Sequence, residues 1–151
     1  MPGSGSGAKR LHHMGITVSD LDRSLAFYSE AFGIEAAYEF EVDAEFAERV
    51  ARVQAPCRGA MLELPNASLE LLQYRTPDAR PYSLRNCDVG AAHPCLEVDD
   101  IDAARERLAA MDVDCFTPPL PIEEGPLAGY RWFYFADPDG IVVELFQPPV
   151  S

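Results

Sequence analysis

Apolar and polar residues follow the same succession of periodicities twice along the chain. In the first half, apolar residues first occupy every second position, as in a strand, then follow helical spacing, and then occupy every second position again. Gly33 suits the left-handed position that ends a helix, and Pro65-Asn66 is a turn-type pair between two strands. The elements predicted for this half are a strand at 11–18, a helix at 21–32, a strand at 36–42, an added helix at 44–54, and strands at 60–64 and 67–74.

The second half repeats this order without the added helix. Asp99 or Asp100 is expected to cap its helix, and 137–140 (Asp-Pro-Asp-Gly) is a strong turn signal. The predicted elements are a strand at 92–98, a helix from 101 to 111, a short extended segment at 113–117, a proline-rich loop at 118–129, and strands at 131–135 and 141–147.

Each half is therefore a βαβββ module, and the predicted fold class is α+β. The modules are expected at 11–74 and 91–151, joined by a linker at 75–90 and preceded by a flexible leader at 1–10. A duplicated module implies that its two copies pair within one structural domain.

Polar residues are duplicated along with the pattern. His13 and His93 are each followed seven residues later by an Asp-x-Asp triplet, and the two histidines are 80 residues apart. Glu70 begins the sequence Glu-Leu-Leu-Gln, and Glu144 begins Glu-Leu-Phe-Gln 74 residues later. Two copies that each carry a histidine and a carboxylate predict one metal site where the copies meet.

The alternation places these four residues on one kind of face. Each lies opposite a mainly apolar stripe of its strand, so helices that cover the stripes leave His13, Glu70, His93 and Glu144 on the other side of the sheets. Simpler interpretations stay open. The histidines can be polar residues at the rim of a cleft, Glu70 can pair with a linker arginine, and Glu144 can be structural. His12 points to the opposite face and is expected to pack or lie at an edge.

Composition narrows the class of partner. The net charge of −13 disfavours a nucleic acid, which needs a basic face. No apolar run is long enough to span a bilayer, and no apolar core of a signal peptide is present. The four irregularly spaced cysteines favour reduced thiols. We therefore expect a cytoplasmic protein that binds a small molecule.

Four stretches of the sequence carry a family resemblance: LHHMGITVSDLDRSLAFYSEAFG, SLELLQY, AHPCLEVDDIDAARERLAAMDV and FADPDGIVVELFQ. They resemble the vicinal-oxygen-chelate superfamily, which includes glyoxalase I, methylmalonyl-CoA epimerase, extradiol dioxygenases and bleomycin resistance proteins. The resemblance implies paired modules whose curved mixed sheets surround a cleft. It also implies metal ligands at His13, Glu70, His93 and Glu144, the pattern of glyoxalase I and methylmalonyl-CoA epimerase.

Two imidazoles and two carboxylates suit Zn²⁺, Ni²⁺, Co²⁺ or Mn²⁺. Such a centre can polarise a carbonyl and stabilise the enolate formed when a neighbouring carbon loses its proton. Glu144 or Glu70 is the candidate general base. The sequence thus predicts a metal-dependent isomerase or lyase of the glyoxalase and epimerase type.

Two alternatives remain. His13, His93 and Glu144 alone would form the two-histidine, one-carboxylate triad of an Fe(II) dioxygenase, and Glu70 is the residue that separates the two chemistries. A binding protein that sequesters a drug without a metal is the other alternative.

Residues for the substrate are less sharply defined by the sequence. Tyr130, Arg131 and Trp132 follow the proline-rich loop and can offer stacking and a cation, or can serve ordinary strand packing. Cys95 lies two residues after His93 and can line the site or pack as a small buried hydrophobe. The resemblance implies a homodimer.

Overall fold

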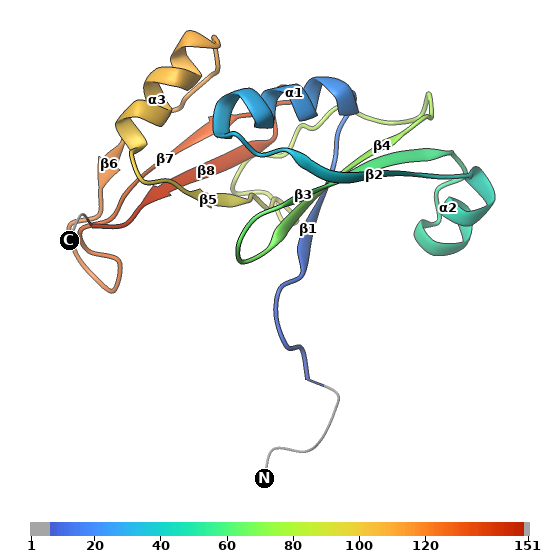
Figure 1. Cartoon of the computed structure of the whole chain (residues 1–151), viewed down its shortest axis with the longest axis horizontal. Coiled ribbons are helices and arrows are strands. Elements are labelled where there is room, and N and C mark those ends of the chain that lie inside the picture. Colours follow the sequence, from blue (N-terminus) through green and yellow to red (C-terminus); the bar gives the residue numbers. More distant parts are fainter. Residues whose placement is uncertain (1–6, 150–151) are drawn as a thin grey trace. The chain divides into compact units, whose positions relative to one another are not determined.

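The computed structural model of the chain describes residues 7–149 and contains two four-stranded mixed sheets (Figure 1). In chain order the elements are β1 (His13–Thr17), α1 (Leu21–Phe32), β2 (Ala36–Val42), α2 (Ala44–Ala51), β3 (Cys57–Glu63), β4 (Ser68–Tyr74), β5 (Cys95–Glu97), α3 (Ile101–Ala110), β6 (Leu120–Pro121), β7 (Arg131–Ala136) and β8 (Val142–Gln147). The predicted α+β class is confirmed. Most of the predicted leader, residues 1–6, and residues 150–151 of the second module lie outside the described residues.

The two sheets have the same topology. Their strand orders are β1-β4-β3-β2 and β5-β8-β7-β6. β1 runs parallel to β4, and β5 runs parallel to β8, whereas the remaining neighbours are antiparallel. The duplication of the sequence is therefore a duplication of strand order and direction.

The first sheet belongs to a compact unit made of the chain up to Leu21 together with Ile34–Thr76. One face of its central strands is apolar and buried, and it includes Ala60, Leu62, Leu69 and Leu71. At the other face the ring of Phe40 on β2 lies over Gly59 on β3. A Cβ added at Gly59 would lie only 2.3 Å from Phe40 Cζ, so only glycine leaves room for the ring.

The inserted helix α2 forms in the same unit but is shorter than predicted. The Asp43 side chain accepts the amide of Phe46 at its N-terminus, and Arg52 ends it in the left-handed conformation with φ 58°. Its expected apolar face is largely open, since Phe46 is 43% and Val50 61% exposed.

The second sheet belongs to a unit made of Asp22–Gly33 and Pro77–Ser151. Helix α1 of the first repeat is therefore part of the unit that holds the second sheet, so the compact units do not follow the repeat boundary. The rings of Phe27 and Phe32 on α1 lie 6.2 and 5.7 Å from the ring of Phe135 on β7. The guanidinium of Arg107 on α3 donates to the carbonyl of Ala31 at 2.9 Å.

Three local predictions for the second half need correction. β5 is limited to 95–97, so His93 precedes the strand and does not lie within it. The segment 113–117 forms only an isolated bridge between Cys115 and Phe135. The strand that completes the second sheet is β6, which lies inside the predicted loop. Because β6 is at the edge of the sheet, it tolerates Pro121, which has no amide hydrogen to donate. Asp100 is the helix cap, as one of the two alternatives predicted.

A glutamine near the end of β4, and another at the end of β8, anchors the start of a helix. Gln73 Oε1 accepts the amide of Leu21 at 3.2 Å, and Gln147 Oε1 accepts the amide of Ile101 at 3.0 Å. Gln73 also donates from Nε2 to the carbonyl of Ser19 at 2.9 Å. The repeated glutamines thus satisfy helix amides that have no partner within the helix.

The described helices are short. The longest, α1, has 12 residues. Between residues 7 and 149 no helix has the length and apolar character needed to cross a membrane.

Candidate metal centre

In the first unit the sheet register brings His13 and Glu70 together. Glu70 on β4 is the Cα partner of Gly15 on β1, and His13 lies two residues before Gly15 on the same face. His13 Nε2 lies 3.6 Å from Glu70 Oε2. A Cβ at Gly15 would touch the same Oε2 at 3.4 Å, so the carboxylate lies directly against the backbone of β1.

The second unit repeats this geometry with the equivalent residues. Glu144 on β8 is the Cα partner of Cys95 on β5, and His93 lies two residues before Cys95. His93 Nε2 lies 3.1 Å from Glu144 Oε2. The same ring nitrogen thus faces the same carboxylate oxygen in both units, which is the outcome expected if the repeated residues have a shared role.

All four side chains are accessible to some degree, and the second pair is more enclosed. The exposed fractions are 40% and 22% for His13 and Glu70, against 32% and 15% for His93 and Glu144. A rim position of the histidines is compatible with these values, but each histidine has a carboxylate partner that a merely solvated residue does not need.

Aromatic rings surround the second pair. The ring of Tyr134 on β7 is the edge-on neighbour of His93 at 5.0 Å and of Trp132 at 5.2 Å. Tyr134 is also the Cα partner of Glu144. Burial and the nearby Glu144 charge raise the pKa of the Tyr134 phenol, so this hydroxyl stays protonated and able to donate. Tyr134 was not identified from the sequence, although counting back from the turn at 137–140 along β7 would have placed it opposite Glu144.

Cys95 is exposed and lies on the same face as the second pair, so its interpretation as a small buried hydrophobe is wrong. Its thiol donates a hydrogen bond to the carboxylate of Glu144. Partial desolvation of the sulfur, followed by the charge of Glu144, raises the pKa of Cys95 to about 12. Cys95 therefore remains a thiol and acts on the carboxylate as a weak donor.

His12 contacts the imidazole ring of His13. Its Nδ1 lies 2.9 Å from Nδ1 of His13, and the two rings are nearly perpendicular. This contact occupies the ring nitrogen of His13 that does not face Glu70. His13 Nε2 therefore remains available to a ligand, which is how a neighbouring group commonly orients a metal-binding histidine.

The residues predicted for substrate contact divide between the two faces of the second sheet. Trp132 shares the face of Glu144, as does Tyr130, whose ring lies 5.0 Å from that of Phe146. Arg131 points to the opposite face, where its guanidinium forms a bidentate pair with Asp102 on α3 at 2.5 and 2.8 Å. The hydrogen bond from Asp102 raises the pKa of Arg131.

Two arginines of the predicted linker form ion pairs with carboxylates other than Glu70. Arg75 pairs with Glu41 at 3.6 Å, and Arg85 pairs with Asp88 at 2.7 Å. The alternative in which Glu70 serves a linker arginine therefore has no support from these two contacts.

Each pair has the chemistry of half a metal centre. Imidazole nitrogen and carboxylate oxygen together suit a divalent ion of the zinc, nickel, cobalt or manganese type. Within either unit, over residues 7–149, no group of three or more His, Cys, Asp or Glu side chains could hold a metal ion. Each pair by itself therefore offers only two of the ligands that such an ion takes.

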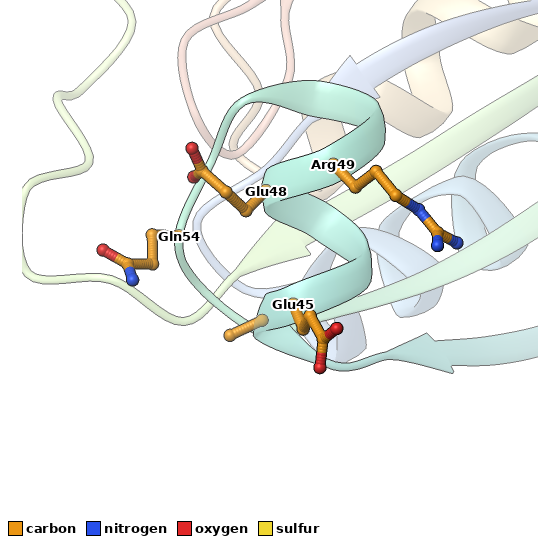
Figure 2. A pocket seen from close by; sticks show the side chains of 5 residues that line it. Glu45, Glu48, Arg49 and Gln54 are labelled. Carbon is orange, nitrogen blue, oxygen red and sulfur yellow. The ribbon is translucent and has the colours of Figure 1, made fainter.

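A separate hollow lies along α2, as Figure 2 shows. Its volume is about 400 Å³, and its lining residues are Ala44, Glu45, Glu48, Arg49 and Gln54. None of these is a predicted ligand, and the hollow is formed mainly by one exposed helix. We therefore assign the candidate chemistry to the His–Glu pairs and not to this hollow.

Comparison with known proteins identifies the family of the chain. Residues 10–145 match the model of the Glyoxalase/Bleomycin resistance protein/Dioxygenase superfamily. A 2-epi-5-epi-valiolone epimerase from Actinomyces sp is 42% identical over an alignment of 151 positions that covers 96% of this chain and 82% of that protein. The mitochondrial methylmalonyl-CoA epimerase of Dictyostelium discoideum is 28% identical over 92% of this chain and 78% of its own length.

A solved structure supports the fold in particular. The crystal structure of a glyoxalase family protein from Bacillus cereus covers 97% of this chain and 99% of its own, with a TM-score of 0.81 and 22% identity. The chain belongs to the glyoxalase, bleomycin resistance and dioxygenase superfamily. Its relatives include epimerases.

Proposed function

We propose that this protein is a metal-dependent epimerase that moves a proton at a carbon next to a carbonyl group. The observation that supports this most is the repeated pair, in which a histidine Nε2 faces a glutamate Oε2 at 3.6 Å in one unit and at 3.1 Å in the other. The epimerase relative at 42% identity supports the same class of reaction.

In this proposal His13, Glu70, His93 and Glu144 hold one divalent ion. Both pairs are required, because two ligands are fewer than catalytic sites of this kind use. The pairs come from one chain or from two chains of a homodimer. When bound, a Zn²⁺, Ni²⁺, Co²⁺ or Mn²⁺ ion acts as a Lewis acid toward the substrate carbonyl. Four side chains with two negative charges also match the charge of such an ion.

The chain itself supplies the groups that move the proton. Inversion at a carbon requires that a base removes the proton from one face and that an acid returns a proton to the other. Glu70 and Glu144 are two carboxylates in two different units, so one can remove the proton from one face while the other passes a solvent proton to the opposite face. The bond between carbon and the departing hydrogen breaks, and a new carbon–hydrogen bond forms on the opposite face with no net oxidation.

The substrate in this proposal is a small ketone. The Actinomyces relative is named for an epimerase of a valiolone, and the ending of that name denotes a ketone. The aromatic residues Trp132 and Tyr134 beside Glu144 provide flat apolar faces that suit the C–H face of a ring.

A dioxygenase is the weaker proposal. The two-histidine, one-carboxylate triad leaves three positions free for substrate and oxygen, and a second carboxylate would occupy one of them. Glu70 faces His13 in the same way that Glu144 faces His93. Because Glu70 has a histidine partner of its own, the four-ligand chemistry of an isomerase is favoured.

The deciding experiment combines metal analysis with solvent exchange. We expect about one Zn, Ni, Co or Mn per chain in protein purified without added metal, and loss of that metal in the His93→Ala variant. We also expect ¹H NMR to show deuterium entering the carbon beside the carbonyl of a cyclic polyol ketone in D₂O. Iron together with oxygen uptake would replace the proposal with the dioxygenase. Protein that binds none of these ions after soaking would overturn it.

A matched variant serves as the control for the loss of a carboxylate elsewhere in the chain. Glu63→Gln changes an exposed carboxylate near the end of β3, outside the proposed site. It is expected to retain both metal and exchange. Light scattering after size-exclusion chromatography tests the proposed homodimer, and a mass of a single 16.6 kDa chain would exclude it.

A further inference from the structure

Among the described residues, the second unit contains five buried polar side-chain atoms that have no hydrogen-bond partner. Tyr82 Oη and Arg105 Nε are two of them, and the other three are Ser24 Oγ and Tyr28 Oη on α1 and Asp137 Oδ2 at the start of the turn after β7. Ser24 and Tyr28 are fully buried, and Asp137 is 5% exposed. An unpartnered polar atom inside a protein costs about 1–3 kcal/mol, so three on α1 and one neighbouring turn call for a common explanation.

The three residues face a common region. Ser24 and Tyr28 are four positions apart in α1 and therefore lie on the same side of the helix. Arg23 Nη2 binds Asp139 Oδ1 at 2.7 Å, which fixes the first turn of α1 against the turn that contains Asp137. Burial raises the pKa of the Tyr28 phenol, and the charges of Asp137 and Asp139 raise it further, so the phenol lies close enough to the turn to interact with both carboxylates.

The donors and acceptors are complementary. Asp137 Oδ1 already accepts the amides of Asp139 and Ile141 at 2.9 and 2.8 Å, so only Oδ2 lacks a donor. Ser24 and Tyr28 each have a hydroxyl hydrogen without an acceptor. One water molecule has two lone pairs for the two hydroxyl groups and a hydrogen for Oδ2, and buried waters commonly make about three such bonds.

The duplicated sequence provides an internal control for this combination. The positions equivalent to Ser24 and Tyr28 in α3 hold Ala104 and Leu108, both apolar and buried. The position equivalent to Asp137 is Glu63, which is exposed. The three positions thus hold buried polar groups together, whereas the equivalent positions hold two apolar residues and one exposed carboxylate, which favours a shared ligand over three unrelated defects.

We infer that Ser24, Tyr28 and Asp137 enclose a binding site for one internal water molecule that links α1 to the turn preceding β8. The site has a consequence for the chemistry of the unit. Asp137 uses one oxygen to hold the backbone of the turn and the other to bind the water, and β8 begins at Val142, two residues before Glu144. The water thus helps to fix the strand that carries a proposed ligand.

The charged groups that face the site are few. The Asp139 carboxylate is neutralised by Arg23, and Asp137 is the titratable member of the site itself. Burial raises the pKa of Asp137 to about 6, and a water that donates to Oδ2 opposes that rise because it stabilises the charged carboxylate.

A high-resolution crystal structure of the full chain tests the inference directly. We expect a density peak within about 3 Å of Ser24 Oγ, Tyr28 Oη and Asp137 Oδ2. An empty region, or a direct bond between Tyr28 Oη and Asp137 Oδ2, would overturn the site. Neither outcome bears on the proposed metal centre, whose test is metal content.

Unfolding in urea supplies a second test, which needs no crystal. Ser24→Ala and Tyr28→Phe are each expected to lower the folding equilibrium constant about tenfold, by loss of one buried hydrogen bond. Because both bonds go to the same water, the double variant should lose clearly less than the product of the two effects. Fully multiplicative losses would show independent sites and contradict the inference. Tyr38→Phe, at a residue 51% exposed, is the control and should leave the constant unchanged.

Discussion

The two His–Glu pairs have the same origin in the sequence but different surroundings. In the first unit the carboxylate of Glu70 lies against the bare backbone of Gly15. In the second, the equivalent position is Cys95, whose thiol donates to Glu144. The second pair is also closer, at 3.1 Å against 3.6 Å, and less exposed. Duplication has therefore preserved the ligand-type atoms while the neighbouring positions have diverged.

This difference suggests a division of labour between the carboxylates. Glu144 is constrained by a histidine, a thiol and an aromatic neighbour, Tyr134. Glu70 has a longer contact with its histidine. We expect Glu144 to be the more firmly positioned ligand and Glu70 to be the carboxylate that moves more easily.

The largest effect is expected from removing either carboxylate charge. Glu70→Gln and Glu144→Gln keep the side-chain shape but remove the base, so each should slow solvent-deuterium exchange into the substrate by about 10²–10⁴-fold. NMR exchange rates measure this at matched metal content. Full exchange in either variant would show that its carboxylate is not needed.

The histidines should differ in their effect on metal affinity. His93→Ala and His13→Ala should each weaken binding by at least about 100-fold, because each removes one of four ligands. His93 belongs to the closer and less exposed pair, so its loss should be the greater of the two. Calorimetric titration with Zn²⁺ gives both values. Equal losses would contradict the proposed asymmetry.

A stability difference of intermediate size is expected at Asp137, whose counterpart in the first unit, Glu63, is exposed. Burial raises the pKa of Asp137 to about 6, above the ordinary value of 3.8. The folded state thus holds its proton more tightly than the unfolded chain, and this contribution is complete below about pH 4 and lost as the pH rises through 6.

Asp137→Asn keeps the acceptor for the two turn amides and removes the titration. It should therefore be more stable than the natural protein above pH 6, by about 1–2 kcal/mol. Urea unfolding at pH 4.5 and 7.5 measures the change. A variant that is less stable at pH 7.5 by the same amount as at pH 4.5 would show that ionisation of Asp137 costs nothing.

The smallest effect is expected at Cys95. Because a thiol is a weak donor, Cys95→Ala should weaken metal binding only about threefold. Cys95→Ser supplies a stronger donor of similar size and should restore the natural affinity. The same weakening in both variants would assign the effect to the sulfur and not to the hydrogen bond.

Much of the fold follows from the sequence because the hydrophobic period is clear where an element is long. The strand at 36–42 matches its prediction, and α1 ends at Gly33 with φ 68° as expected. The errors lie where a strand depends on its partner. β6 has only two residues, one of them proline, and its pairing with β7 comes from the sheet and not from any local pattern.

Some features of the candidate site could likewise be predicted from the sequence, and others could not. Alternation and repeat spacing selected the four residues, and strand register places His13 beside Glu70 and His93 beside Glu144. That the four share one ion stays a prediction. The face of Arg131 was missed, although its odd position relative to Trp132 contained that information. That α1 belongs to the unit holding the second sheet was not predictable, since no local signal says which sheet a helix will cover.

The glutamine in the last two residues of β4, and its counterpart in β8, also make the strand register unique. Glu70 and Gln73 are three residues apart, so they lie on opposite faces of β4, one toward the candidate ligand and one toward the start of a helix. Glu144 and Gln147 repeat this on β8. A slip of one residue would reverse both faces at once, burying a carboxylate and leaving a helix amide unpaired. The same four-residue segment that provides the chemistry thus makes a misaligned strand unstable.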